Sequence, residues 1–213
     1  EESTTRAISS CLKRNNSKFL PLLWVSLYKA ISKYFPAKND VERILFRTPV
    51  EMLHRKFIGT IKPDTLNGLI GYLVLQTEID KNTSFVDVVY KVSQEYKDHF
   101  SHTLQPLQTL IEFKNLGYPH IGPYTLDACT TGITEMDTSL VKDFNLVIAN
   151  LVSLSNCSYL FHLFSFDKIG TILNVSFCTP GYPVKVMKDI VDTTVGYMKK
   201  YATDTTRTLY CDF

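Results

Sequence analysis

Apolar residues recur at intervals of three and four near the start of the chain, which is the spacing of a helix that buries one face. We expect a first helix from about Thr5, capped by Ser3 or Thr4, and a longer one from Lys18 that Pro36 closes. The apolar positions of the longer helix share one broad stripe. They are Leu20, Leu23, Trp24, Leu27, Ala30, Ile31 and Tyr34.

The same spacing predicts three further helices. One begins at the capping residue Ser84, a shorter one covers residues 104–113, and the last begins at Pro183, followed from Thr203 by a polar, frayed tail. The faces expected to be buried are Phe85, Val88, Val89, Val92, Tyr96 and Phe100 in the first of these, and Val184, Met187, Ile190, Val191, Val195 and Met198 in the last.

Strands are predicted where β-branched and aromatic residues cluster without helical spacing. Residues 41–50 and 69–79 form one such pair. Residues 145–153, 159–166 and 170–177 follow one another closely enough to predict an antiparallel meander. With no internal repeat and no long linker, residues 1–213 are predicted to form a single α/β domain, a mixed and largely antiparallel sheet covered by helices.

Composition narrows the class of protein. The chain has 213 residues, 45% of them hydrophobic, and a formal charge of +2 without any long run of like charges. This argues against disorder and against a nucleic-acid partner, and no apolar run is long enough to form a transmembrane segment. Five scattered cysteines without a C-x-x-C pair favour a reducing, cytoplasmic location, although sequons at Asn15, Asn82, Asn156 and Asn174 leave secretion open.

None of the five histidines lies in a metal-binding motif. His99 and His102 are three residues apart at a helix end, where histidines more often cap carbonyl groups or meet solvent. His162 lies inside a predicted strand, with Asp167 five positions later, so a hairpin allows the two to form a base and its orienting partner. A strand histidine on a polar face is the favoured alternative. Neither a metal site nor a catalytic histidine is therefore predicted.

The cysteines and glycines give no catalytic signature either. No cysteine lies in a recognisable nucleophile motif, and the glycines form no phosphate-binding sequence. Residues 118–124, with two prolines and two glycines, form a substrate or partner loop or, as we favour, an ordered connection. The sequence alone thus shows no complete catalytic constellation.

Five segments nevertheless resemble a known group of proteins. In chain order they read TTRAISSCLKRNNSKFLPLLWVSLYKAISKYF, RILFRTPVEMLHRKF, DTLNGLIGYLVL, TSFVDVVYKVSQEYKDHF and DFNLVIANLVSL. Their order resembles the C-terminal half of the chloramphenicol-acetyltransferase-like superfamily, which includes alcohol acetyltransferases, plant-type acyltransferases and peptide-synthetase condensation domains. The resemblance covers about Thr4 to Tyr201 and implies one lobe of a two-lobe α/β fold with a tunnel between the lobes.

The resemblance also implies that the catalytic histidine lies on a different lobe from this one. The catalytic histidine of this superfamily lies in an H-x-x-x-D motif on the N-terminal lobe, and no such motif occurs in this sequence. The chain is then either the acceptor-side lobe of an acyltransferase, inactive alone and completed by a lobe or partner chain that carries H-x-x-x-D, or a catalytically silent binding or scaffold protein. The implied substrates are a thioester of coenzyme A or of a carrier protein and a small alcohol or amine, with no tightly bound cofactor.

Three polar residues are the candidates for contact with a substrate. Asn150 and Ser153 lie in the strand expected to line the tunnel, and Asn67 approximates a Gly-Asn position of the superfamily. Arg55 is an approximate match to its arginine segment, and Asp143-Phe144 retains only the first two residues of its D-F-G-W-G-like motif.

Overall fold

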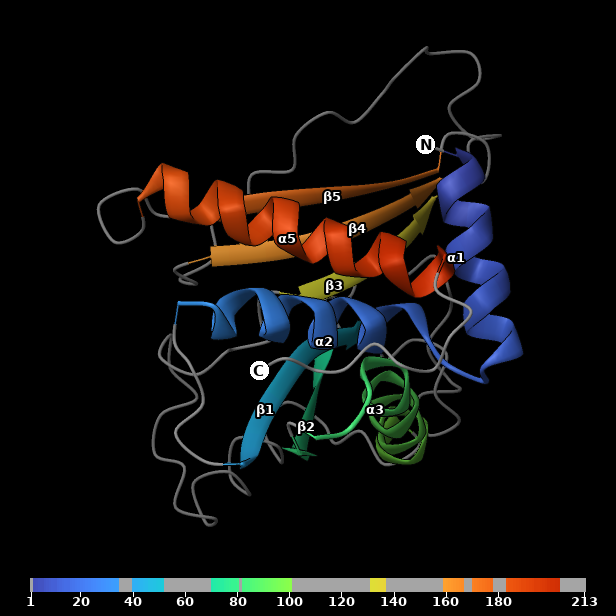
Figure 1. Cartoon of the computed structure of the whole chain (residues 1–213). Coiled ribbons are helices and arrows are strands. Elements are labelled where there is room, and N and C mark those ends of the chain that lie inside the picture. The colour runs from blue at the N-terminus through green and yellow to red at the C-terminus, as the bar shows by residue number, and fades with distance from the viewer. Residues whose placement is uncertain are drawn as a thin grey trace.

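The computed structural model contains four helices and five strands among the residues that it describes (Figure 1). The helices are α1 (Glu2–Arg14), α2 (Phe19–Ser32), α3 (Phe85–Phe100) and α5 (Val184–Thr203). The strands are β1 (Val41–Glu51), β2 (Ile70–Asp80), β3 (Thr131–Met136), β4 (Tyr159–Phe166) and β5 (Gly170–Phe177). The structure describes residues 2–34, 40–51, 70–80, 82–100, 131–136, 159–166, 170–177 and 183–203.

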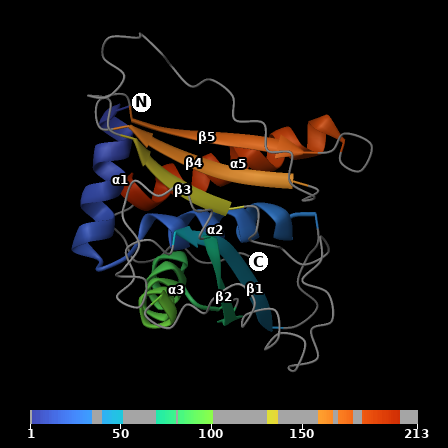
Figure 2. The same ribbon diagram turned by 180° about the vertical axis from the view of Figure 1, so that it is seen from behind.

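Helix α2 lies at the centre of the molecule. Every residue from Leu20 to Ala30 is buried, so the single apolar stripe predicted from the sequence understates its burial. On one side Leu27 and Ala30 pack with α5 against β5, and on the other Trp24 packs edge-to-face on Tyr96 of α3. The helix therefore runs across the place where the three-stranded sheet meets the layer formed by β1, β2 and α3, and β1 contacts β3 directly there (Figures 1 and 2).

The strands form two sheets in the described part of the chain. Strands β1 and β2 pair in antiparallel register from Val41↔Asp80 to Glu51↔Ile70, which confirms both predicted strands within one residue. Along the second half of β2, Leu73, Leu75, Thr77 and Ile79 are buried while the residues between them face solvent where they are described.

The second sheet has the order β3-β4-β5. Strands β4 and β5 form the predicted antiparallel hairpin with the predicted boundaries. The predicted meander is wrong at the other edge of β4, because β3 pairs with that edge in parallel register. Strand β3, with the sequence TGITEM, was not predicted because it is short, contains a glycine and lacks an apolar run. Residues 104–113 and 145–153 lie outside the described residues.

Two helix predictions need correction. Helix α1 begins at Glu2 rather than near Thr5, and the hydroxyl of Thr5 accepts a hydrogen bond from the backbone N–H of Thr171 at 3.0 Å. Val184, expected in the buried face of α5, is 60% exposed in the first turn. Tyr201, which was not included in that face, is fully buried against Phe85 in the main core. The cap at Ser84 is confirmed, because its hydroxyl accepts from Asp87 N–H at 3.2 Å.

The turn between α1 and α2 is fastened to α3 through Asn16. This residue has a φ of 52°, in the left-handed region that asparagine tolerates better than most residues. The ammonium group of Lys97 donates to both the backbone and side-chain oxygens of Asn16 at 2.8 Å, and Gln94 donates to the same backbone oxygen at 3.0 Å. The turn is thus tied to a helix some eighty residues away in sequence.

Replacing Asn16 separates the effect of backbone strain from that of the side chain. We expect Asn16→Ala to lower the free energy of unfolding by about 1–2 kcal/mol, because alanine resists the left-handed conformation and cannot accept from Lys97. Asn16→Gly should cost less, since glycine adopts this φ freely. Urea denaturation measures both variants. Equal losses would show that strain at this position is not the cause.

Candidate functional site

The packing of α2 and α5 decides which face of the β3-β4-β5 sheet is covered. Leu173, Val175 and Phe177 of β5 pack against the buried residues Leu27 and Met187 of the two helices and their neighbours. Side chains alternate between faces along a strand, so the intervening positions of β5 belong to the opposite face. No described helix lies on that face (Figure 2).

His162 occupies the middle of the opposite face. It pairs with Asn174 on β5, which is on the face away from the helices, and with Gly132 on β3. A histidine position, an asparagine position and a glycine position therefore form one row across the sheet. Residues in neighbouring strands at one register position lie about 5 Å apart.

The rows on either side of His162 are mostly apolar. On the same face, β4 contributes Leu160, Phe164 and Phe166, and β5 contributes Ile172 beside Phe164. The helix-covered face of β4 is also apolar in sequence at Phe161 and Leu163. A strand that is apolar on both faces is typical of a strand covered on both faces.

The predicted substrate residues Asn67, Asn150 and Ser153 lie outside the described residues, as do Arg55 and the Asp143-Phe144 pair. Asp167, the suggested partner of His162, also lies outside them. These predictions are therefore untested. The row of His162, Gly132 and Asn174 escaped sequence reasoning because it depends on a strand that was not predicted. The signal that was present is the one polar, titratable residue in the otherwise apolar run YLFHLF.

Cys11 is held in a structural network between α1 and α5. Its thiol donates to the backbone oxygen of Tyr201 at 3.2 Å, and Asn15 donates to the Tyr201 hydroxyl at 3.3 Å. The sulfur also accepts from Arg14 at 3.5 Å. Cys11 is 4% exposed, so this side chain fastens two helices and is not presented to a substrate.

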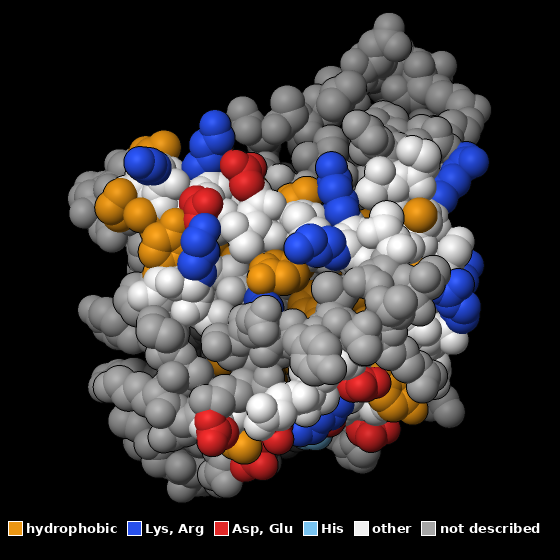
Figure 3. Space-filling view, in the orientation of Figure 1, with side chains coloured by type: hydrophobic (Ala, Val, Ile, Leu, Met, Phe, Trp, Pro, Cys, Tyr) orange, Lys and Arg blue, Asp and Glu red, His pale blue; other side chains and the backbone are white. Residues whose placement is uncertain are grey.

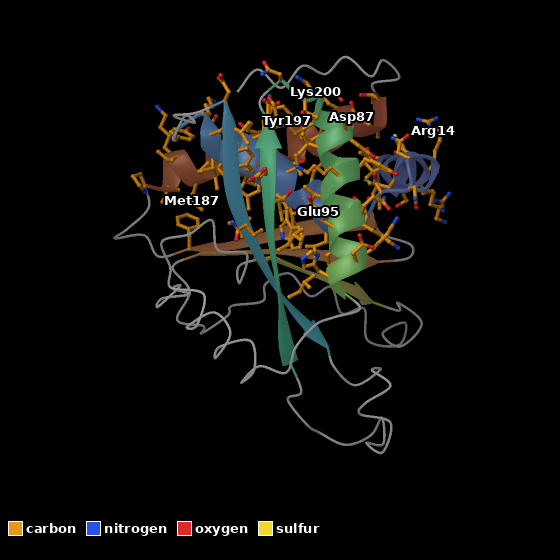
Figure 4. All side chains as sticks on the ribbon, turned by 90° about the horizontal axis from the view of Figure 1, so that it is seen from below. Arg14, Asp87, Glu95, Met187, Tyr197 and Lys200 are labelled. Carbon is orange, nitrogen blue, oxygen red and sulfur yellow. The ribbon has the colours of Figure 1, made fainter. Side chains whose placement is uncertain are left out.

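Charged and aromatic groups lie where α5 packs beside α2. The ammonium groups of Lys29 and Lys200 lie 5.7 and 5.8 Å from the centre of the Tyr197 ring. Figure 4 shows Tyr197 and Lys200 towards the end of α5 that approaches α1, far from Met187 at its other end. Cations at this distance from a tyrosine ring are attracted by its negative face.

A polar cluster ties the end of α2 to α5 at the surface. Asp189 accepts from Lys33 at 2.7 Å and from the hydroxyl of Tyr34 at 2.6 Å. The hydrogen bond from Lys33, with a smaller contribution from Tyr34, holds the pKa of Asp189 below its usual value. This cluster is exposed and serves the packing of the two helices rather than a site.

Two further features bear on function. Among the described residues, no group of three or more His, Cys, Asp or Glu side chains is placed to hold a metal ion. None of the described helices has the length and apolar character required to cross a membrane. On one face, Lys and Arg side chains spread over the α5 and α1 layer together with a few Asp and Glu side chains, and further Asp and Glu side chains lie at the lower edge (Figure 3).

Several solved structures have a fold similar to that of this chain. The first condensation domain of the calcium-dependent antibiotic synthetase, in complex with a substrate analogue, matches with a TM-score of 0.63 and 12% identity over 95% of this chain. The fold of this chain is therefore similar to that of part of a condensation domain. This confirms, at the level of the fold, the predicted resemblance to a superfamily that includes condensation domains.

Other neighbours agree. The X-domain from teicoplanin biosynthesis gives a TM-score of 0.65 at 12% identity over 95% of this chain, and a complex of that domain with OxyB gives 0.64 at 12% identity over 96%. The chain spans only 42 to 45% of these three neighbours. No family model and no curated protein matches the sequence, so the relationship rests on the fold.

The burial of Tyr201 at the junction between α1 and α5 predicts how the stability of the fold depends on pH. Burial raises the pKa of Tyr201, although hydrogen bonds with Ser17 and Asn15 partly oppose this effect. The ordinary pKa of a tyrosine hydroxyl is about 10. Below that pH the hydroxyl of Tyr201 keeps its proton in both the folded and the unfolded state, whereas above it the unfolded state loses the proton first. The contribution of Tyr201 to the free energy of unfolding is therefore fully present below about pH 10, and it is lost as the pH rises towards the pKa of Tyr201 in the folded state.

We expect the free energy of unfolding to fall less steeply above about pH 10 in Tyr201→Phe than in the natural chain, by up to about 1.4 kcal/mol per pH unit. Tyr90→Phe is the matched control, because Tyr90 is 45% exposed. Urea denaturation at a series of pH values measures the slopes. The same slope in the natural chain and in Tyr201→Phe would contradict a raised pKa at Tyr201.

Proposed function

We propose that the chain is the acceptor-side lobe of an acyltransferase, which moves an acyl group from a thioester of coenzyme A or of a carrier protein to an alcohol or amine. The general base comes from a second lobe that carries H-x-x-x-D. The observation that carries this proposal is the condensation-domain fold over 95% of the chain, together with its coverage of only 42% of that neighbour. The absence of H-x-x-x-D from this sequence supports the proposal that the chain is the half without the base.

One face of the β3-β4-β5 sheet, which no described helix covers, supports a second lobe (Figure 2). The positions of β4 that face away from α2 and α5 include Leu160, Phe164 and Phe166, with Ile172 beside them on β5. Extended apolar faces are rarely left in water, because burying them is favourable by about 25 cal/mol for each Å² removed from solvent. A lobe packed over this face, with a tunnel left between the two, covers these positions and leaves His162 and Asn174 near the space where substrates meet.

The chemistry explains why one lobe alone is insufficient. A base on the second lobe removes the proton of the acceptor hydroxyl, and the oxygen then attacks the thioester carbonyl. The carbon–sulfur bond breaks, the acyl group stays on the acceptor oxygen, and the sulfur leaves as a thiol after it receives the proton. The acceptor-side lobe holds the acceptor in line with the carbonyl and excludes water, which would otherwise hydrolyse the thioester.

A binding or scaffold role is the second candidate. A neighbour with a TM-score of 0.64 is solved in a complex with another protein, OxyB. A domain of this fold can therefore offer a protein-binding surface. Under this proposal the natural polypeptide contains no H-x-x-x-D motif at all, and the sequence of the intact polypeptide from its source, read by mass spectrometry, distinguishes the two candidates.

The acyltransferase proposal predicts that the purified 213-residue chain releases no free thiol from acetyl coenzyme A in the presence of alcohols or amines, above the uncatalysed rate. The intact natural polypeptide, or the chain together with a lobe that carries H-x-x-x-D, should show thiol release and acylated product. Detection of the thiol by a chromogenic disulfide and of the product by mass spectrometry measures both steps.

The matched control replaces the histidine of the H-x-x-x-D motif by alanine in the complete protein, which should abolish turnover while the fold is retained. Turnover by the 213-residue chain alone would overturn the proposal. His162→Ala in the complete protein should alter the dependence on acceptor concentration more than it alters the maximal rate, since His162 is not the general base under this proposal.

A further inference from the structure

We draw no further inference here: the strongest candidate, the surface patch of exposed lysines and arginines along α1 and α5, is interrupted by Asp189 and Asp192, and nothing in the structure shows what covers it.

Discussion

The burial of α2 on every side is the constraint on which the rest of the structure depends. A helix that is buried around its whole circumference is covered in all directions, and here α5 with β5 covers one side while β2 and α3 cover the other. This central helix positions the three-stranded sheet relative to the β1–β2 layer. It also decides which face of β5 is filled by helices.

The helices and the hairpin were predictable because each has a strong local pattern. The spacing of Trp24 and its neighbours, the cap at Ser84 and the uninterrupted run YLFHLFSF all act over a few residues. Strand β3 was missed because its pairing partner, β4, lies almost thirty residues further along the chain and supplies the stability that its own sequence lacks. The full burial of Tyr201 and α2 likewise depends on contacts between distant segments.

The same limit applies to the site. The chemical type of His162 marked it as a candidate from the sequence, but its neighbours Gly132 and Asn174 belong to the pairing of three strands and could not be read from spacing. The resemblance to condensation-like proteins rested on the order of segments, and the fold confirms it at 12% identity. Sequence order thus survived where residue identity did not, because many apolar sequences of the right volume and pattern fill the same core.

The bond from Cys11 to the backbone of Tyr201 joins residues that are 190 positions apart. The inner face of α1 therefore lacks this contact until α5 has been synthesised. Until then α1 and α2 keep apolar surface uncovered, and the core closes only after α5 has been made. A chain that stalls before α5 would therefore expose apolar surface that chaperones bind.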